Sequence, residues 1–286
     1  MSRPPQPFLL GVAGDPVDHS LSPAFQNAAL SRLGLPFLYR AFRCPDPKSL
    51  RKLIESAPSL GLKGLNLTTP LKEAGARLLI SAGSADREVR WSRSANTLLL
   101  DGPIAGFSTD GRGGRLWLEE RGVSSRSRIL VLGAGASARS LLWHLWEAGW
   151  EGIRLVTRRP EAVRRLFSRS GLAAARAAEV VPPDRLKEGE AGAFDALVST
   201  WPPEAVTPSR TRALASCLAP SAAVFDFNYG RGRDRLHRWA SARGYRSADG
   251  RGLLLHQGAL SFTAWTRRRP PLDVMRRALG LDGPAG

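Results

Sequence analysis

Short apolar runs alternate along the chain with longer segments whose apolar residues recur every three or four positions. The short runs have the length and composition of buried strands. They cover residues 8–12, 36–42, 63–68, 95–100, 129–132, 153–157, 194–199 and 222–228. Strands that alternate with helices at this spacing predict a parallel sheet covered by helices on both faces, which is an α/β fold.

The helical segments begin and end at residues that commonly start and stop helices. Ser22 and Pro23 are the types preferred at an N-cap and at the first helical position, and Gly34 follows the last periodic residue. The predicted helices cover residues 22–33, 47–57, 111–120, 137–148, 160–168, 253–265 and 272–279. A turn is predicted at residues 101–103, where aspartate, glycine and proline follow one another.

A glycine-rich loop joins the apolar run 129–132 to the helix that follows it. Its sequence matches the G-x-G-x-x-A form of the dinucleotide-binding fingerprint. Gly133 permits the tight turn, Gly135 lets a pyrophosphate approach the backbone, and Ala138 allows helix and strand to pack closely. The N–H groups at the helix start can then bind the phosphates. The predicted nucleotide-binding loop consists of Gly133, Ala134, Gly135, Ala136, Ser137 and Ala138.

The fingerprint begins well past the first hundred residues, so we expect another folded part in front of it. With 286 residues, the chain is long enough for two cores of ordinary size. We expect residues 1–109 and 250–286 to form an α/β substrate-binding and catalytic domain, to which the C-terminal helices return. Residues 110–249 are expected to form a Rossmann-type domain that binds the nucleotide.

The strand after the glycine loop indicates which nucleotide is bound. It ends in Thr157, Arg158 and Arg159, at a place where NAD-binding folds normally carry an acidic residue. A carboxylate there would repel a 2′-phosphate, whereas an arginine can bind it with two hydrogen bonds. These residues favour NADP over NAD. The alternative is that both arginines are solvated side chains in an arginine-rich chain.

Composition limits the class of protein further. The net charge is +17, but the arginines are spread along the chain, so we expect no specific nucleic-acid site. No apolar run reaches about eighteen residues, and residues 1–7 lack the apolar core of a signal peptide, so we expect no membrane partner. Only Cys44 and Cys217 occur, and the histidines show no ligand spacing. We therefore expect a cytoplasmic protein without a metal site.

Six segments on the two sides of the glycine loop resemble, in order, the successive motifs of the shikimate dehydrogenase family. They are residues 19–23 (HSLSP), 66–73 (NLTTPLKE), 95–97 (ANT), 106–110 (GFSTD), 226–229 (DFNY) and 249–257 (DGRGLLLHQ). The resemblance implies an NADP-dependent enzyme that interconverts 3-dehydroshikimate and shikimate. It implies that the reaction takes place between the two domains, and we expect a monomer or a homodimer whose partner is this small molecule.

The resemblance also implies roles for individual residues. Lys72 and Asp110 match the catalytic pair, in which the lysine serves as acid or base for the developing alkoxide and the aspartate orients its ammonium. The implied substrate-binding residues are Ser20, Ser22, Asn66, Thr68, Lys72, Asn96, Asp110, Tyr229 and Gln257, with the two serines on the carboxylate. Outside the glycine loop, the implied cofactor-binding residues are Thr157, Arg158, Arg159, Thr200 and Gly250.

Each of these roles has a purely structural alternative. Without a role in the reaction, Lys72 would be a surface lysine. Asp110 and Ser22 would be helix N-caps. Asparagine and threonine residues at strand ends commonly form turns. Tyr229 is otherwise a half-buried aromatic residue of the core. The sequence leaves these alternatives open.

Several residues depart from the family pattern, and most of them belong to the expected cofactor site. They are Ser108, Thr157, Arg159, residues 199–203 (STWPP) and Leu253. The departures concern cofactor affinity and selectivity more than the identity of the substrate.

Three other functions stay open: a quinate or aminoshikimate dehydrogenase of the same family, a catalytically weak sensor on the same scaffold, and a polyanion-binding protein.

Overall fold

The computed structural model describes residues 7–186 and 192–281. Within these residues the chain forms two compact units. Unit 1 ends its first part at Gly113 and resumes at Leu254, and the intervening residues form unit 2. The units change four residues after each boundary of the predicted domains, so Asp110 belongs to unit 1. The signal-peptide prediction concerns residues 1–7, of which residues 1–6 lie outside the described residues.

Unit 1 is built on a five-stranded sheet in the order β2-β1-β3-β4-β5. Its strands are β1 (Phe8–Gly14), β2 (Phe37–Arg43), β3 (Leu62–Leu67), β4 (Thr97–Leu99) and β5 (Ala105–Phe107). β1 is parallel to β2 and β3, as predicted, whereas β4 is antiparallel to both of its neighbours. The parallel prediction is wrong for β4. A short turn around Gly102 joins β4 to β5 as a hairpin, which makes this pair antiparallel.

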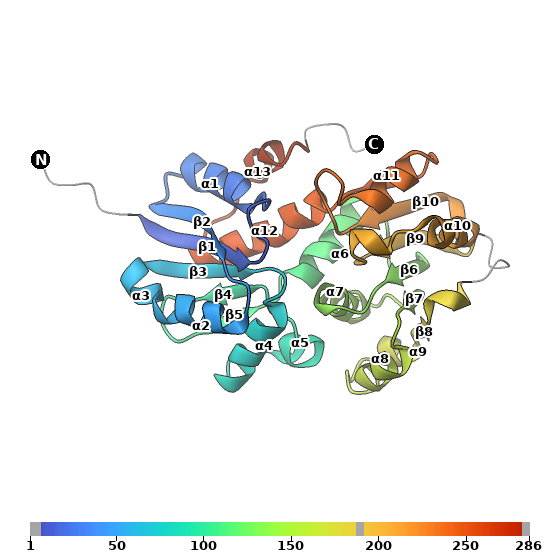
Figure 1. Cartoon of the computed structure of the whole chain (residues 1–286), viewed down its shortest axis with the longest axis horizontal. Coiled ribbons are helices and arrows are strands. Elements are labelled where there is room, and N and C mark those ends of the chain that lie inside the picture. Colours follow the sequence, from blue (N-terminus) through green and yellow to red (C-terminus); the bar gives the residue numbers. More distant parts are fainter. Residues whose placement is uncertain (1–6, 187–191, 282–286) are drawn as a thin grey trace, which may run out of the picture. The chain divides into compact units, whose positions relative to one another are not determined.

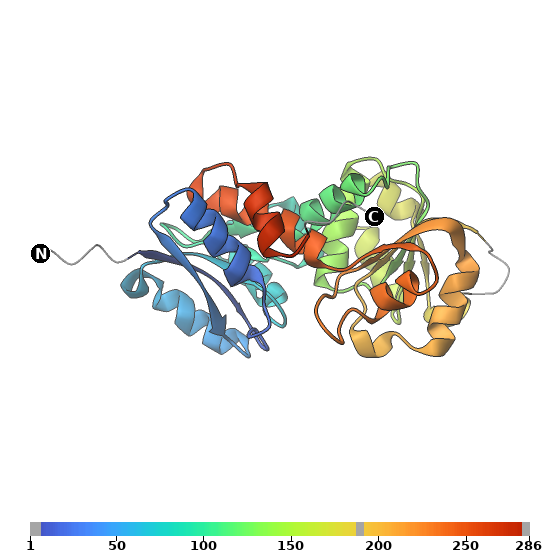
Figure 2. The same ribbon diagram turned by 90° about the horizontal axis from the view of Figure 1, so that it is seen from above.

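Helices cover both faces of the unit 1 sheet. They are α1 (Ser22–Arg32), α2 (Pro47–Glu55), α3 (Ala57–Leu60), α4 (Lys72–Ser81), α5 (Arg87–Ser92), α12 (Arg251–Thr266) and α13 (Leu272–Ala278). Helix α13 lies beside α1 in both views (Figures 1 and 2). Helices α1, α12 and α13 lie on the face opposite α2 and α3 (Figure 2). The predicted return of the C-terminal helices to the first part of the chain is confirmed.

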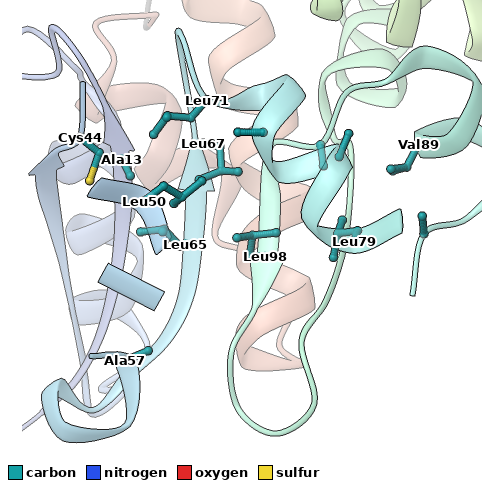
Figure 3. Packing of buried hydrophobic residues seen from close by; sticks show 14 of the residues in the cluster. Ala13, Cys44, Leu50, Ala57, Leu65, Leu67, Leu71, Leu79, Val89 and Leu98 are labelled. Atoms are coloured by element: carbon teal, nitrogen blue, oxygen red, sulfur yellow. The ribbon is translucent and has the colours of Figure 1, made fainter. Parts of the chain in front are cut away.

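The core on the α2 side of this sheet determines where the polar residue of β3 points. Leu65 and Leu67 of β3 pack in one buried cluster with Leu50 of α2 and Leu79 of α4 (Figure 3). Because successive side chains of a strand point to opposite faces, Asn66 points away from this cluster. Its polar side chain therefore lies on the face that α12 covers.

The start of α1 differs from the sequence prediction. Leu21 occupies the N-cap position, and no side chain caps the helix there. Ser20 Oγ instead accepts a hydrogen bond from the N–H of Ser22 at 3.3 Å. Ser22 is the first residue of the helix, and its side chain is buried. The interpretation of Ser22 as the N-cap is therefore wrong.

Unit 2 contains a six-stranded sheet in the order β11-β10-β9-β6-β7-β8. Its strands are β6 (Ile129–Leu132), β7 (Ile153–Val156), β8 (Glu179–Val181), β9 (Phe194–Ser199), β10 (Leu218–Asp226) and β11 (Arg246–Ala248). Every neighbouring pair is parallel. The chain proceeds from β6 to one edge and then from β9 to the other, which is the doubly wound Rossmann order. The predicted Rossmann-type fold is confirmed, with its topological switch point between β6 and β9.

Helices pack on both faces of the unit 2 sheet. They are the end of α6 (Asp110–Glu120), α7 (Ala136–Glu147), α8 (Pro160–Phe167), α9 (Ala173–Ala177), α10 (Pro208–Cys217) and α11 (Arg235–Ser241). Val224 of β10 packs on one face with Leu214 of α10 and Leu236 of α11. On the other face, Phe225 meets Trp117 of α6 edge to face, with ring centroids 5.0 Å apart. The central strands are therefore buried on both sides, as their continuous apolar runs predict.

Strand β10 ends in a buried carboxylate that fixes the chain after it. Asp226 is 1% exposed, and its Oδ2 accepts hydrogen bonds from the N–H groups of Leu236 and His237 in α11. Its Oδ1 accepts the N–H of Asn228 at 3.0 Å. Burial raises the pKa of the Asp226 carboxyl, although these hydrogen bonds act in the opposite direction. One side chain thus connects the end of β10 to the first turn of α11.

Two further features concern the described part of the chain as a whole. None of its helices combines the length and apolar character that crossing a membrane requires. Among the same residues, no group of three or more histidine, cysteine or acidic side chains could hold a metal ion. Cys44 and Cys217 are both buried, and neither forms a disulfide.

Replacing Leu65 by alanine should destabilise unit 1. The side chain is fully buried in the cluster of Figure 3, so its truncation removes apolar contacts and leaves a cavity. Such substitutions cost about 2 to 5 kcal/mol of unfolding free energy. Leu60→Ala is the control, because Leu60 is 43% exposed. Urea unfolding should give the large loss for Leu65→Ala only, and equal losses in the two variants would contradict this account.

Replacing Asp226 by asparagine should change how stability depends on pH. Because burial raises the folded-state pKa, the folded protein binds more protons than the unfolded chain between the two pKa values. The stabilisation is present in full below the ordinary carboxyl pKa of 3.8 and is lost as the pH rises through the folded-state pKa. In urea unfolding above about pH 4, the free energy of unfolding of Asp226→Asn should therefore fall less with pH than that of the wild type.

Asp273 provides the control of opposite sign. A hydrogen bond from the Arg277 side chain lowers the pKa of this exposed carboxyl. Its stabilisation is therefore present above the ordinary pKa and is lost as the pH falls through the folded-state value. If Asp226→Asn and Asp273→Asn changed the pH dependence in the same direction, the assignment for Asp226 would be wrong.

Candidate active site

A lysine and an aspartate of unit 1 meet, each at the start of a helix. Lys72 is the first residue of α4, and Asp110 is the first residue of α6. Lys72 Nζ donates a hydrogen bond to Asp110 Oδ2 at 2.5 Å, and the two side chains are 19% and 5% exposed. A carboxylate is favourable at a helix N-terminus, whereas an ammonium is not. Lys72 therefore does not stabilise its own helix at this position. The carboxylate of Asp110 compensates the positive charge of its ammonium group instead.

This arrangement bears on the structural alternatives for Lys72 and Asp110. Lys72 is not a solvated surface lysine, because most of its side chain is buried against a carboxylate. Asp110 begins its helix, but both of its carboxylate oxygens accept hydrogen bonds from other side chains. The second of these donors is Asn96. The sequence prediction that Lys72 and Asp110 lie together agrees with these contacts.

Asn96 connects the Asp110 carboxylate to the backbone around it. Its Nδ2 donates to Asp110 Oδ1 at 2.8 Å, and its Oδ1 accepts the N–H of Thr109 at 2.7 Å. The preceding residue, Ala95, donates its N–H to the carbonyl of Lys72 at 3.0 Å. The side chain is 2% exposed, so Asn96 is not a surface turn residue. The segment 95–96 therefore holds both members of the pair.

Gln257 joins the same site from α12. Its Oε1 accepts hydrogen bonds from Asn96 Nδ2 and from Thr109 Oγ1, each at 3.3 Å. Its Nε2 donates to the carbonyl of Leu254 at 3.0 Å. The amide is thereby oriented by both ends, with its oxygen toward the Asn96 side chain.

The side-chain amide of Asn66 forms hydrogen bonds with other groups of the protein. Its Oδ1 accepts from Tyr39 Oη at 2.8 Å, and its Nδ2 lies within hydrogen-bond distance of Thr97 Oγ1 at 3.1 Å and Ser261 Oγ at 3.0 Å. It also lies 3.0 Å from the carbonyl oxygen of Asn96. Two amide protons thus face three protein acceptors, which leaves the second lone pair of Oδ1 for another group.

The sequence interpretation missed the hydroxyl groups that support these amides. We call them the hydroxyl layer, and its members are Tyr39, Thr97, Thr109 and Ser261. Thr97 Oγ1 and Ser261 Oγ lie 2.9 Å apart although the residues are far apart in the sequence. Residue type gave only a weak signal, because a serine or threonine inside an apolar run is also common in ordinary cores.

The expected substrate-binding residues Ser20, Ser22 and Thr68 follow strands of the same sheet. Ser20 and Ser22 come after β1, and Thr68 comes directly after β3, four residues before Lys72. β1 and β3 are parallel neighbours, and Thr68 donates its N–H to the carbonyl of Ala13 at 2.9 Å. Ligands of such sheets bind at the carboxyl ends of the strands. These residues therefore belong to the edge of the sheet at which a ligand is expected.

The glycine loop of unit 2 has the geometry that a dinucleotide requires. Gly133 has a φ of 100°, and a Cβ there would lie 2.4 Å from Thr200 Oγ1, so only glycine fits. Gly135 is the N-cap of the twelve-residue helix α7, and a Cβ on it would meet open space. Ala138 is fully buried. The first N–H groups of α7 thus follow Gly135, where no side chain fills the space beside the backbone. A pyrophosphate suits such a position at a helix N-terminus.

The end of β7 carries the residues expected at the adenosine ribose. Thr157 is buried and donates its N–H to Val181 of β8, whereas Arg158 and Arg159 are exposed. Arg159 is the N-cap residue of α8, and its N–H donates to Thr157 Oγ1 at 3.3 Å. No acidic side chain occupies this turn. The turn thus carries two positive charges and no carboxylate, which suits a 2′-phosphate.

Tyr229 and Gly250 lie together in unit 2. Gly250 donates its N–H to the carbonyl of Asn228 at 3.0 Å. A Cβ on Gly250 would lie 2.2 Å from the carbonyl oxygen of Phe227 and 3.3 Å from Tyr229 Cδ1, which requires a glycine there. Tyr229 is half-buried. The candidate residues are thus divided, with the lysine–aspartate pair in unit 1 and the glycine loop and Tyr229 in unit 2.

Comparison with known proteins gives the family. The family description "Shikimate dehydrogenase substrate binding domain" matches residues 12–98, and "Shikimate 5'-dehydrogenase C-terminal domain" matches residues 250–279. The chain is 37% identical to the shikimate dehydrogenase (NADP(+)) of Symbiobacterium thermophilum, covering 94% of this chain and 92% of that protein. It is 36% identical to that of Methanothrix thermoacetophila, covering 95% and 96%.

Solved structures agree. The shikimate dehydrogenase of Mycobacterium tuberculosis superimposes with a TM-score of 0.81 at 28% identity, covering 96% of this chain and 99% of that one. The enzyme of Thermus thermophilus in complex with NADP(H) and shikimate has a TM-score of 0.76 at 30% identity, covering 96% and 98%. With this fold, this arrangement of polar residues and these relatives, the chain belongs to the shikimate dehydrogenase family.

Proposed function

We propose that this protein is an NADP-dependent shikimate dehydrogenase, which reversibly reduces 3-dehydroshikimate to shikimate. The observation that carries the proposal is the hydrogen bond between Lys72 Nζ and Asp110 Oδ2 at 2.5 Å. This acid–base pair lies among amides and hydroxyls that suit a polyhydroxylated ring. In unit 2, the glycine loop and the acid-free turn at Arg158 supply a site for a phosphorylated dinucleotide.

The residues of the pair divide the chemistry between them. When bound, NADPH would supply the hydride, a hydrogen with the two electrons that reduce the carbonyl carbon. Lys72 Nζ donates a proton to the oxygen as negative charge develops there, and it becomes a neutral amine. Asp110 holds Nζ in place, and Asn96 holds Asp110. In the oxidative direction, the neutral amine of Lys72 removes the hydroxyl proton.

Substrate recognition follows from the remaining polar groups of the predicted site. Ser20 and Ser22 bind the carboxylate, with hydroxyls and N–H groups at the start of α1. Thr68, Asn96, Gln257 and Tyr229 bind ring hydroxyls. Asn66 contributes through the second lone pair of its Oδ1, because its protons face protein acceptors.

Cofactor binding rests on the residues of unit 2. The loop from Gly133 to Ala138 binds the pyrophosphate at the N-terminus of α7. Arg158 and Arg159 bind the 2′-phosphate, and Thr157 shapes the turn that carries them. Thr200 lies against Gly133, and Gly250 lies beside Tyr229. These positions suit NADP better than NAD, because a carboxylate is lacking where NAD needs one.

We also propose that the enzyme works in the cytoplasm, as a monomer or a homodimer. The sparse use of cysteine, with Cys44 and Cys217 buried as thiols, is typical of a reducing compartment. Analytical ultracentrifugation over a range of protein concentrations distinguishes the two states of assembly.

One set of assays tests the function as a whole. Oxidation of NADPH and of NADH is followed separately with 3-dehydroshikimate and with 3-dehydroquinate. The proposal predicts the highest kcat/KM for NADPH with 3-dehydroshikimate. A preference for 3-dehydroquinate would instead identify a quinate dehydrogenase. NADPH binding without turnover would identify a catalytically weak relative.

Replacing Lys72 by alanine should lower kcat by about 10² to 10⁴, because the proton donor is lost. The Kd of NADP⁺, measured by calorimetry, should stay nearly unchanged, since Lys72 belongs to unit 1 and the glycine loop to unit 2. Lys63→Ala is the matched control. Lys63 Nζ forms a similar pair with Asp101 Oδ1 at 2.6 Å, but Asp101 is 73% exposed. An alanine variant at position 72 that kept most of its kcat would overturn the assignment.

Replacing Arg158 by serine should weaken NADP⁺ binding by about 10- to 100-fold and leave NAD⁺ binding nearly unchanged. The reason is that only NADP⁺ carries the phosphate that a guanidinium binds with two charged hydrogen bonds. Arg212→Ser, a change of the same charge on the exposed side of α10, is the control. Equal weakening of both nucleotides by Arg158→Ser would place Arg158 elsewhere than at the 2′-phosphate.

A further inference from the structure

Three loops follow β6, β9 and β10 at the carboxyl edge of the unit 2 sheet, and side-chain hydrogen bonds connect them. The first connection joins the glycine loop to the loop after β9, which we call the Trp201 loop (residues 200–205). Thr200 donates both its N–H and its Oγ1 hydrogen to the carbonyl of Leu132, each at 2.9 Å. Leu132 directly precedes Gly133, so this connection begins at the pyrophosphate turn.

The second connection joins the Trp201 loop to the loop after β10. Asn228 Nδ2 donates to the carbonyl oxygen of Trp201 at 2.8 Å. The same Nδ2 donates to Asp226 Oδ1 at 2.8 Å, and Asp226 Oδ1 also accepts the N–H of Asn228. Asp226 is in turn held by the first turn of α11. The Asn228 side chain is thus fixed by a buried carboxylate before it reaches Trp201.

The sequence of the Trp201 loop makes this second connection important. Pro202 and Pro203 have no N–H, and their rings fix φ, so the loop is stiff and has few backbone donors of its own. Arg210 adds to this stiffness, because its guanidinium lies 5.2 Å from the centroid of the Trp201 ring and Nη1 donates to Ala205 O at 2.8 Å. A stiff loop takes its position from its attachments, which include Thr200 to the glycine loop and Asn228 to the loop after β10, besides Arg210 and the hydrogen bond from the Trp201 N–H to Ser199 Oγ at 3.2 Å.

The position of the Trp201 loop determines the space above the glycine loop. A Cβ on Gly133 would lie 2.4 Å from Thr200 Oγ1 and 3.4 Å from Trp201 Cδ1. The two loops flank the switch point between β6 and β9, where dinucleotides bind in doubly wound sheets. A shift of the Trp201 loop would therefore change the place available to the pyrophosphate.

We propose that Asn228, held by Asp226, is a positioning residue for dinucleotide binding, which sets the Trp201 loop against Gly133 through the Trp201 carbonyl. This inference rests on the proposed function, because it assumes that the cofactor binds at the glycine loop. Asn228 acts through Trp201 and not by contact with the cofactor. Its loss should therefore weaken cofactor binding without affecting the proton transfer at Lys72.

The test replaces Asn228 by leucine, which has the same number of side-chain heavy atoms and the same branching and lacks both amide hydrogen bonds. Loss of one such hydrogen bond should raise the Kd of NADP⁺ about fivefold, measured by calorimetry. In steady-state kinetics, KM for NADPH should rise by a similar factor, with kcat and KM for 3-dehydroshikimate little changed. The calorimetric stoichiometry reports the folded fraction, so a purely structural role would lower the stoichiometry and leave Kd unchanged.

Two further variants complete the test. Asn228→Ser removes the same hydrogen bond to Trp201 with a small polar side chain, and the same rise in Kd is expected if the leucine variant does not fold. Asp195→Asn is the control, because Asp195 lies at the opposite end of β6 and β9. There its Oδ2 accepts a hydrogen bond from the N–H of Arg128 at 2.8 Å. Its Kd for NADP⁺ should equal that of the wild type.

Three results would overturn the inference. Wild-type Kd in both Asn228 variants would show that the Trp201 loop needs no such support, while leaving the proposed function intact. An equal rise in Asp195→Asn would indicate a general effect of stability. Absence of NADP⁺ binding in the wild-type protein would overturn the proposed function, and with it this inference.

Discussion

The ion pair between Lys72 and Asp110 constrains the rest of unit 1. Two oppositely charged groups that are mostly removed from water must be close together and hydrogen-bonded, because either one alone would be costly to bury. Their contact requires the turn before α4, the start of α6 and the segment at Asn96 to converge. The parallel core of β1, β2 and β3 supplies the edge on which these segments end.

The sequence predicted the parts of this protein that depend on local patterns. The glycine loop, the strands with continuous apolar runs and the two-part organisation follow from short-range signals. Helices α4 and α10 were missed for a physical reason. α4 follows Pro70 and contains Gly75, which must lack a side chain because Leu67 Cδ1 would lie 2.3 Å from its Cβ. α10 buries only Thr211, Leu214 and Cys217, so its apolar pattern is faint.

The candidate site shows the same division. Lys72, Asp110 and the amides were found because they belong to motifs of a known family. Thr97 and Thr109 lie in these motifs too but were given no role, and Ser261 lies outside the motifs, 164 positions from its partner Thr97. A hydroxyl inside an apolar run has the same local pattern whether it supports a site or fills a core. Only the paired geometry distinguishes the two.

The hydroxyl layer has a consequence for how this protein can vary during evolution. Each hydroxyl satisfies an amide that also serves a neighbour, as Thr97 does for Asn66 and Asn96. A valine at position 97 would keep the volume of threonine, yet it would leave buried amide groups of two asparagines with fewer partners. Members of the layer are therefore expected to change together or not at all, so a lineage that alters substrate choice must replace them as a set.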